Sequence, residues 1–345
     1  MRTKSLLSLV LLLTVTTSMA FSGDGWEKKP PKWHEIPPFP TPTPEPATHV
    51  LSVGVRDAKS DHGGDINAQR VRDAFVQFSS VKTAQVLPLT IGGIIDNRVA
   101  LETMVDSMKA KVRPGDTFIF FIDCHGGFDF FGDETLVWAQ ASVLSFDFRV
   151  PTTGDEYFGL SRGDPAENIN DDDFSQLFLD DTWEEVDKLF IISSCYSGGF
   201  WGDTIEGDTG DLARLHKTAL IAASKESDFT YTLPDSETGL YLGNLGTALV
   251  ATLEELKEQD SITYQELFNG LIHQGSIFEG SNGYILDFED NWGVEVPVTF
   301  ELFGAATEDF ELTLGVPEPS SIVLLVLGAV MIGFGRFLRR RSNKA

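Results

Sequence analysis

The sequence is poor in cysteine and in positive charge, and each shortage excludes a class of protein. Two cysteines in 345 residues are too few for a disulfide-built scaffold or for a zinc site made of cysteines. Lysine and arginine number 26 against 52 aspartate and glutamate, so the formal net charge is −26 at pH 7. Such a chain lacks the basic patch that nucleic acid requires, and we expect no nucleic-acid partner.

The composition is nevertheless that of a folded chain. Apolar residues make up 42% and charged residues 23%, which is ordinary for a packed core and too apolar for a disordered protein. The length allows two domains, although a single α/β domain can be this long.

The first residues have the pattern of a secretory signal. Arg2 and Lys4 precede an apolar run at residues 6–13, and Ser18-Met19-Ala20 supplies small residues near a cleavage point. We predict a signal peptide over residues 1–20. A membrane anchor is the alternative, but the apolar run is shorter than the ~20 residues that a span requires.

The last residues combine a short motif, an apolar stretch and a basic cluster. Pro-Glu-Pro stands at 317–319, residues 322–334 are apolar, and three arginines follow at 339–341. A basic flank beside an apolar helix is typical of the cytoplasmic side of a membrane. Together these features resemble the PEP-CTERM sorting tail of Gram-negative bacteria. A plain C-terminal anchor is the alternative.

The resemblance assigns residues 316–345 to a sorting tail that contains a transmembrane helix. It implies an exosortase as the partner that cuts the tail. It also implies a protein that is anchored transiently in the inner membrane and then exported to the periplasm, the cell surface or the extracellular matrix.

Between the two ends, a proline-rich linker precedes a segment of alternating strands and helices. Residues 21–47 contain eight prolines, which indicates an extended spacer. Strands are predicted at 49–55, 84–91, 118–122, 189–192, 218–223 and 296–302, and a hairpin or loose strands at 136–148. Helices are predicted from Asp65 as a possible cap and at 101–112, 174–178, 247–257 and 264–273. The alternation predicts an α/β fold with a mostly parallel central sheet flanked by helices.

Two of the predicted strands are followed by chemically suggestive residues. His125 comes shortly after the apolar run 118–122, and Cys195 comes shortly after the run 189–192, with glycines beyond both. Ligands of parallel sheets bind beyond the carboxyl ends of the strands. A thiol needs a nearby base to become a thiolate near neutral pH, and an imidazole suits that task.

These residues resemble the caspase-like cysteine peptidases, the group that includes caspases, metacaspases and legumains. The matching motifs are His-Gly at 125–126 and Ser-Cys-Tyr-Ser-Gly-Gly at 194–199. Asp-Ile-Asn-Ala at 65–68, Pro-Gly-Asp at 114–116 and Ala-Ala-Ser at 222–224 fit the same order. The resemblance implies a caspase-like three-layer α/β fold for residues 48–304, with residues 305–315 as a linker to the tail.

The resemblance also implies a mechanism. Cys195 would be the nucleophile, His125 the general acid and base, and the backbone N–H groups of Gly126 and Cys195 the oxyanion hole. The reaction would be hydrolysis of a peptide bond in a protein or peptide substrate through an acyl-enzyme, with no cofactor required. The alternatives are an inactive relative that serves as a surface or matrix binding protein, and a transamidase-type acyl transferase.

The second cysteine, Cys124, is adjacent to His125 and is expected to face the opposite side of the strand. We interpret it as a buried thiol, and a redox lock with Cys195 is the alternative.

Specificity is where the chain departs from the family pattern. Metacaspases that cut after Arg or Lys carry an Asp two residues before the nucleophile, where this chain has Ser193, and their second acidic pocket residue corresponds to Ala68. We take Asp57, Asp61, Asp65 and Ser193 as candidates for lining a substrate pocket, and the overall acidity favours a basic P1 residue.

Calcium is the only metal that the sequence suggests. Asp171, Asp172 and Asp173 offer several oxygen ligands close together, as Ca²⁺ requires. The alternative is a favourable acidic first turn at a helix N-terminus.

Overall fold

The computed structural model describes residues 45–93, 96–128, 156–160, 168–195, 197–202, 212–225, 230, 232–259, 262–279 and 300–304. The chain divides into a unit of residues 1–45 and a unit of residues 46–345, and every element below belongs to the second unit. The predicted signal peptide, the hairpin expected at 136–148 and the C-terminal membrane helix lie outside the described residues. Within the described ranges, no helix is both long and apolar enough to cross a membrane.

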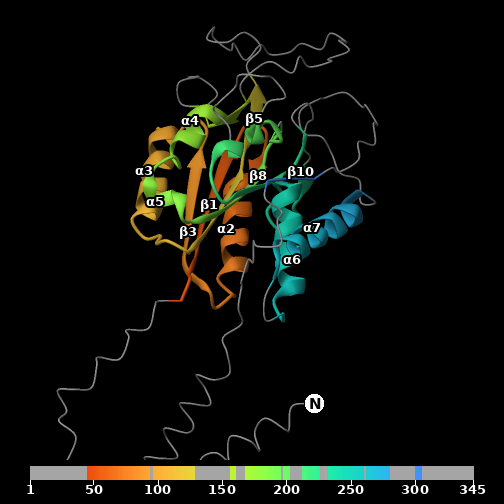
Figure 1. Ribbon diagram of the computed structural model, residues 1–345. Helices are drawn as coiled ribbons and strands as arrows, with labels where there is room; N and C mark the ends of the chain where they lie inside the picture. Colours follow the sequence, from red (N-terminus) through yellow and green to blue (C-terminus); the bar gives the residue numbers. More distant parts are fainter. Residues whose placement is uncertain are drawn as a thin grey trace, which may run out of the picture. The chain divides into compact units, whose positions relative to one another are not determined.

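A twisted sheet forms the centre of the fold (Figure 1). Its five parallel strands lie in the order β3, β1, β4, β8, β9, and β12 adds to β9 in the antiparallel direction. Their bounds are β1 Thr48–Asp57, β3 Val81–Thr90, β4 Thr117–Asp123, β8 Asp187–Ser193, β9 Thr218–Ala222 and β12 Glu301–Gly304.

Helices cover both faces of this sheet, as the three-layer α/β prediction requires (Figure 1). One face packs against α3 (Asn97–Lys109), α4 (Asp171–Gln176) and α5 (Asp181–Glu184). The other face packs against α2 (Gly64–Phe75), α6 (Asn244–Leu256) and α7 (Tyr264–Glu279). The predicted fold class is confirmed.

Strand β4 explains why continuous apolar runs form the middle of the sheet. Phe118, Phe120 and Ile122 belong to the core on the α3 side, whereas Ile119 and Phe121 belong to the core on the α2 side. A strand that is covered on both faces buries every side chain, so it has no polar alternation.

Several short strands surround the carboxyl ends of the main strands. β2 (His62–Gly63) folds back on the end of β1, and β11 (Tyr241–Gly243) and β10 (Thr232–Pro234) continue the sheet from β2. A second sheet consists of β5 (His125–Phe128), β6 (Glu156–Gly159) and β7 (Ile169–Asn170). Short 3-10 turns lie at η3 (Gly199–Trp201) and η4 (Leu212–Arg214).

The predicted strands and helices of the described ranges are present, with adjusted ends. The structure corrects one detail: Asp65 is not the cap of the first helix. Helix α2 has Gly63 at its N-cap without a side-chain cap, and Asp65 lies inside the first turn. There its negative charge still interacts favourably with the positive end of the helix dipole.

Candidate active site

The two chemically suggestive segments leave the sheet side by side. β4 and β8 are adjacent parallel strands, and their last residues, Asp123 and Ser193, are register partners. The Cys124 N–H donates to the carbonyl oxygen of Ser193 at 3.2 Å. His125 and Cys195 each stand two residues beyond the paired ends of these neighbouring strands.

Gly126 and Cys195 meet through their backbones. A β-carbon on Gly126 would collide with the Cys195 carbonyl oxygen and would lie 3.0 Å from the Cys195 nitrogen. Because backbone atoms cannot move aside cheaply, the approach requires glycine. The contact brings the residue that follows His125 onto the backbone of the candidate nucleophile. Cys195 is half-buried and the His125 side chain is 21% exposed.

Buried serines hold the segment around Cys195 against the end of β9. The Ser197 N–H donates to Ser224 Oγ at 3.3 Å, and the Ser224 N–H donates to Ser197 Oγ at 3.1 Å. Ser224 Oγ also donates to the carbonyl oxygen of Ser194 at 3.2 Å. These bonds connect Ser194 and Ser197, on either side of Cys195, to Ser224. They give a physical role to the Ala-Ala-Ser motif at 222–224.

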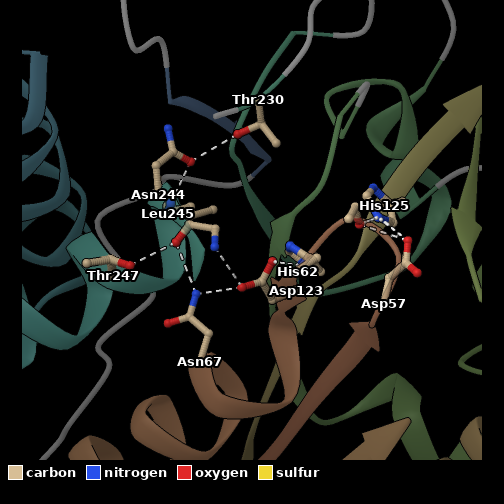
Figure 2. Close-up of polar contacts among 11 residues, drawn as sticks. Asp57, His62, Asn67, Asp123, His125, Thr230, Asn244, Leu245 and Thr247 are labelled. Carbon is tan, nitrogen blue, oxygen red and sulfur yellow. Dashed lines mark hydrogen bonds and ion pairs between the residues drawn. The ribbon is translucent and has the colours of Figure 1, made fainter. Parts of the chain in front are cut away.

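A backbone donor lies beside the sulfur of Cys195. The Thr230 N–H donates to Cys195 Sγ at 3.5 Å, and Thr230 Oγ1 donates to Asn244 Oδ1 at 3.0 Å. Asn244 Oδ1 also accepts the Leu245 N–H at 2.6 Å, so the first residue of α6 fixes Thr230 (Figure 2). An N–H aimed at sulfur favours the thiolate over the thiol.

A buried carboxylate binds the ring of His125. His125 Nε2 lies 3.2 Å from Asp57 Oδ2 and 3.1 Å from Ser60 Oγ (Figure 2). Asp57 is 1% exposed, and its carboxylate also accepts from Ser60 Oγ at 2.8 Å and from the Lys59 N–H at 3.0 Å.

A second histidine–carboxylate pair lies next to the first. His62 Nε2 is 3.4 Å from Asp123 Oδ1, and the rings of His62 and His125 are 5.1 Å apart (Figure 2). Asp123 Oδ2 accepts from Asn67 Nδ2 at 2.6 Å and from the Gly243 N–H at 3.1 Å. This carboxylate therefore joins β4 to α2 and to the strand that precedes α6.

The acidic surroundings determine the protonation of His62. Burial opposes the charged imidazolium, but the charge of the Asp123 carboxylate 3.4 Å away and the charges of Asp57 and Asp65 outweigh it. They raise the pKa of His62 above its ordinary value.

One part of the chain matches a known family. A model described as the PEP-CTERM protein-sorting motif matches residues 315–341. The C-terminal tail is a PEP-CTERM sorting segment. The match covers the tail alone, and no curated protein matches the sequence.

Solved structures show distant similarity. Caspase-1 from Spodoptera frugiperda has a TM-score of 0.46 at 12% identity, with 79% of this chain and 90% of that chain covered. A structure of pro-sf-caspase-1 has a TM-score of 0.44 at 11% identity, with coverages of 75% and 91%. A protein from Geobacter sulfurreducens has a TM-score of 0.45 at 15% identity, with coverages of 66% and 89%. Similarity of this degree identifies no activity.

The four candidate pocket residues occupy different surroundings. Asp57 contacts His125, whereas Asp61 is exposed in the turn between β1 and β2 with φ of 53°. Asp65 pairs with Arg56 at 3.6 Å. Ser193 is 1% exposed, and its Oγ lies against Gly243, where a β-carbon would strike it.

Four residues of this site were not predicted from the sequence: His62, Asn67, Asp123 and Thr230. Asp123 carried a usable signal, because it stands two residues before His125 in the strand-end motif. The other three come from segments that only the folded chain brings to this edge of the sheet.

The remaining predictions concern Cys124 and the acidic run. Cys124 is a thiol that is 3% exposed in the core on the α3 side, so the prediction of a buried thiol is confirmed. Asp171, Asp172 and Asp173 form the first turn of α4, where Arg98 binds Asp173 at 2.7 Å. In the described part of the chain, no group of three or more acidic, histidine or cysteine side chains is arranged to hold a metal. Calcium binding stays a prediction, which a chelator and Ca²⁺ add-back would test.

Proposed function

We propose that the chain is an exported caspase-like cysteine endopeptidase in which Cys195 is the nucleophile and His125 the general acid and base. The observation that supports it most is the close approach of Gly126 to the Cys195 backbone. That approach joins the two segments in which the histidine and the cysteine follow neighbouring parallel strands.

In the proposed reaction, the Cys195 sulfur is the nucleophile and the His125 imidazole carries the proton. The Cys195 thiolate attacks the scissile carbonyl carbon, and the imidazolium of His125 then gives its proton to the leaving amine. The neutral imidazole next takes a proton from water, whose oxygen attacks the acyl carbon and releases the acid product with the thiolate. The Thr230 N–H, which already donates to the sulfur, would help to hold the negative charge between turnovers.

The tetrahedral oxygen requires donors that are in place beforehand. The Gly126 and Cys195 N–H groups are the candidates, because the Gly126 contact and the serine network fix the backbone around both. Pre-positioned N–H groups of this kind commonly contribute about 10²–10³-fold to turnover.

Export is the second part of the proposal. The PEP-CTERM segment at 315–341 directs the protein to the cell envelope of a Gram-negative bacterium, where an exosortase removes the tail. Deleting residues 315–341 should leave the protein in the periplasmic fraction, whereas the intact chain should reach the membrane and the cell surface. The same surface delivery without residues 315–341 would contradict this part.

The activity is tested by alkylation and by cleavage. The full chain is treated with iodoacetamide, Cys195 labelling is followed by peptide mass spectrometry, and cleavage is profiled with a peptide library. We expect Cys195→Ala to abolish cleavage. His125→Ala should slow cleavage by about 10²–10⁴-fold and should slow alkylation at pH 6.

Matched controls are available in the same chain. Cys124→Ala removes the buried thiol, and His216→Ala removes an exposed histidine that contacts the Glu184 carbonyl. Both variants should keep cleavage and labelling. Labelling of Cys195 that ignores His125, with no cleavage, would overturn the proposal in favour of a binding protein. Products that carry an added amine would instead indicate a transferase.

A further inference from the structure

The β1–β2 hairpin closes around the imidazole of His125. Asp57 ends β1 and is the register partner of His62 on β2. Ser60 lies in the turn between them and contacts His125 Nε2, while the His62 ring packs 5.1 Å from the His125 ring. Three side chains of one short hairpin thus contact the candidate general base (Figure 2).

Burial and hydrogen bonds hold the Asp57 carboxylate in one position. It is buried, and both of its oxygens accept hydrogen bonds from the turn, Oδ1 from the Lys59 N–H and Oδ2 from Ser60 Oγ. Burying a carboxylate is costly unless donors surround it. The turn supplies those donors and leaves Oδ2 within 3.2 Å of His125 Nε2.

A neutral imidazole carries a proton on one ring nitrogen and none on the other. The group that accepts a hydrogen bond from the N–H determines which nitrogen carries the proton. A carboxylate accepts hydrogen bonds and cannot donate them, so Asp57 favours the tautomer with the proton on Nε2. Nδ1 is then the nitrogen that is left to exchange a proton with Cys195.

We propose that Asp57 is the positioning residue of His125, which completes an Asp57–His125–Cys195 relay in which the carboxylate fixes the tautomer and stabilises the imidazolium. This inference rests on the proposed function. It departs from our expectation that Asp57 lines a substrate pocket.

The titratable groups at this edge of the sheet come from four elements. Asp57 on β1 and His62 on β2 contact His125, whereas Asp123 at the end of β4 and Asp65 on α2 act on His62. His62 pairs with Asp123, whereas the Asp57 carboxylate directly contacts Nε2. Removal of the Asp57 charge therefore acts on the His125 imidazolium most directly, and through it on the thiolate of Cys195.

The test compares Asp57→Asn with Asp116→Asn in the full chain. Asp116 is a matched control because its Oδ2 lies 3.1 Å from His49 Nε2 at the opposite end of β1. It is a second buried carboxylate–histidine contact, formed far from Cys195. The rate of Cys195 alkylation by iodoacetamide is measured from pH 4 to pH 10 by peptide mass spectrometry, with cleavage kinetics and thermal unfolding in parallel.

We expect Asp57→Asn to shift the alkylation profile to higher pH and to lower the rate at pH 6 by about 10-fold or more, because the imidazolium loses the adjacent carboxylate and the thiolate then loses its cationic partner. In cleavage, kcat should fall while KM stays nearly constant. Asp116→Asn should lower thermal stability and leave the alkylation profile unchanged.

Three outcomes overturn the inference in distinguishable ways. A wild-type alkylation profile in Asp57→Asn, with His125→Ala still defective, refutes the positioning role and leaves the peptidase intact. A rise in KM with kcat unchanged returns Asp57 to the substrate pocket. Alkylation that is insensitive to both His125 and Asp57 refutes the proposed function itself.

Discussion

Asp123 and Ser193 are register partners at the ends of neighbouring strands, and both side chains lie against Gly243. The carboxylate of this pair stands on β4, before the histidine, whereas its partner on β8, before the cysteine, is neutral. There Asp123 accepts from Asn67 and from the Gly243 N–H and faces His62. Ser193 is thus the neutral member of the pair, beside a carboxylate that is already bound.

A carboxylate at position 193 should destabilise the protein unless Asp123 is replaced at the same time. Ser193→Asp places a second buried carboxylate beside Asp123 without a cation of its own, and we expect a loss of about 3–5 kcal/mol in the free energy of unfolding. The double variant with Asp123→Ser should lose less than the sum of the single losses, by about 0.5–3 kcal/mol. Urea denaturation of all four proteins measures this coupling, and strict additivity would show that the two side chains do not share one site.

Gly126→Ala should disable the site through the backbone. The added methyl collides with the Cys195 carbonyl, so the segments must separate, at a cost of about 1–3 kcal/mol in stability. Cleavage should fall about 10²–10³-fold as the oxyanion donors move. Gly115→Ala is the control, since Gly115 has φ of 83° and open space around it and so loses stability without touching the site. Equal activity in both variants would remove Gly126 from the mechanism.

Ser224→Ala should loosen the segment around Cys195. It leaves the Ser197 N–H and the Ser194 carbonyl without their partner, at a cost of about 1–3 kcal/mol. Ser52→Ala is the control, because it removes a buried hydroxyl that donates to the Ala68 carbonyl in the β1–α2 contact. Turnover measured well below both unfolding temperatures should fall in Ser224→Ala and hold in Ser52→Ala. An unchanged kcat in Ser224→Ala would assign the serine network to stability alone.

His62 should make stability depend on pH in a defined direction. Its pKa is raised in the folded protein, so its charged form stabilises the fold below the unfolded value of about 6.5, and this contribution is lost as the pH rises through the folded value. The free-energy difference between the wild type and His62→Gln should therefore be largest near pH 6 and should shrink toward pH 9. Thermal unfolding across that range measures it, and a difference that grows with pH would contradict the assignment.

The sequence predicted the parts of the fold whose signal is local. The apolar runs at 118–122 and 189–192 favour strands buried on both faces, and the residues that follow parallel strands share one edge of the sheet. Both runs are parallel strands in the structure. β2 and β7 have two residues each and carry no periodicity of their own. Tertiary pairing creates them, and sequence patterns do not record it.

The site was predictable to the same extent. His125 and Cys195 follow strands that the pattern locates, but the contact of Asp57 with His125 depends on a hairpin too short to recognise. Asn67 and Asp123 are 56 positions apart and meet only because α2 begins where β4 ends. Interactions of this kind depend on packing between elements, so no local spacing rule finds them.

The requirement for glycine at position 126 gives a simple criterion for comparing related chains. A homologue that keeps both the histidine and the cysteine but carries a side chain at this position cannot close the same backbone contact. We expect such a chain to be inactive even when its histidine and cysteine align with those of this protein. A chain with glycine at this position can still form the contact.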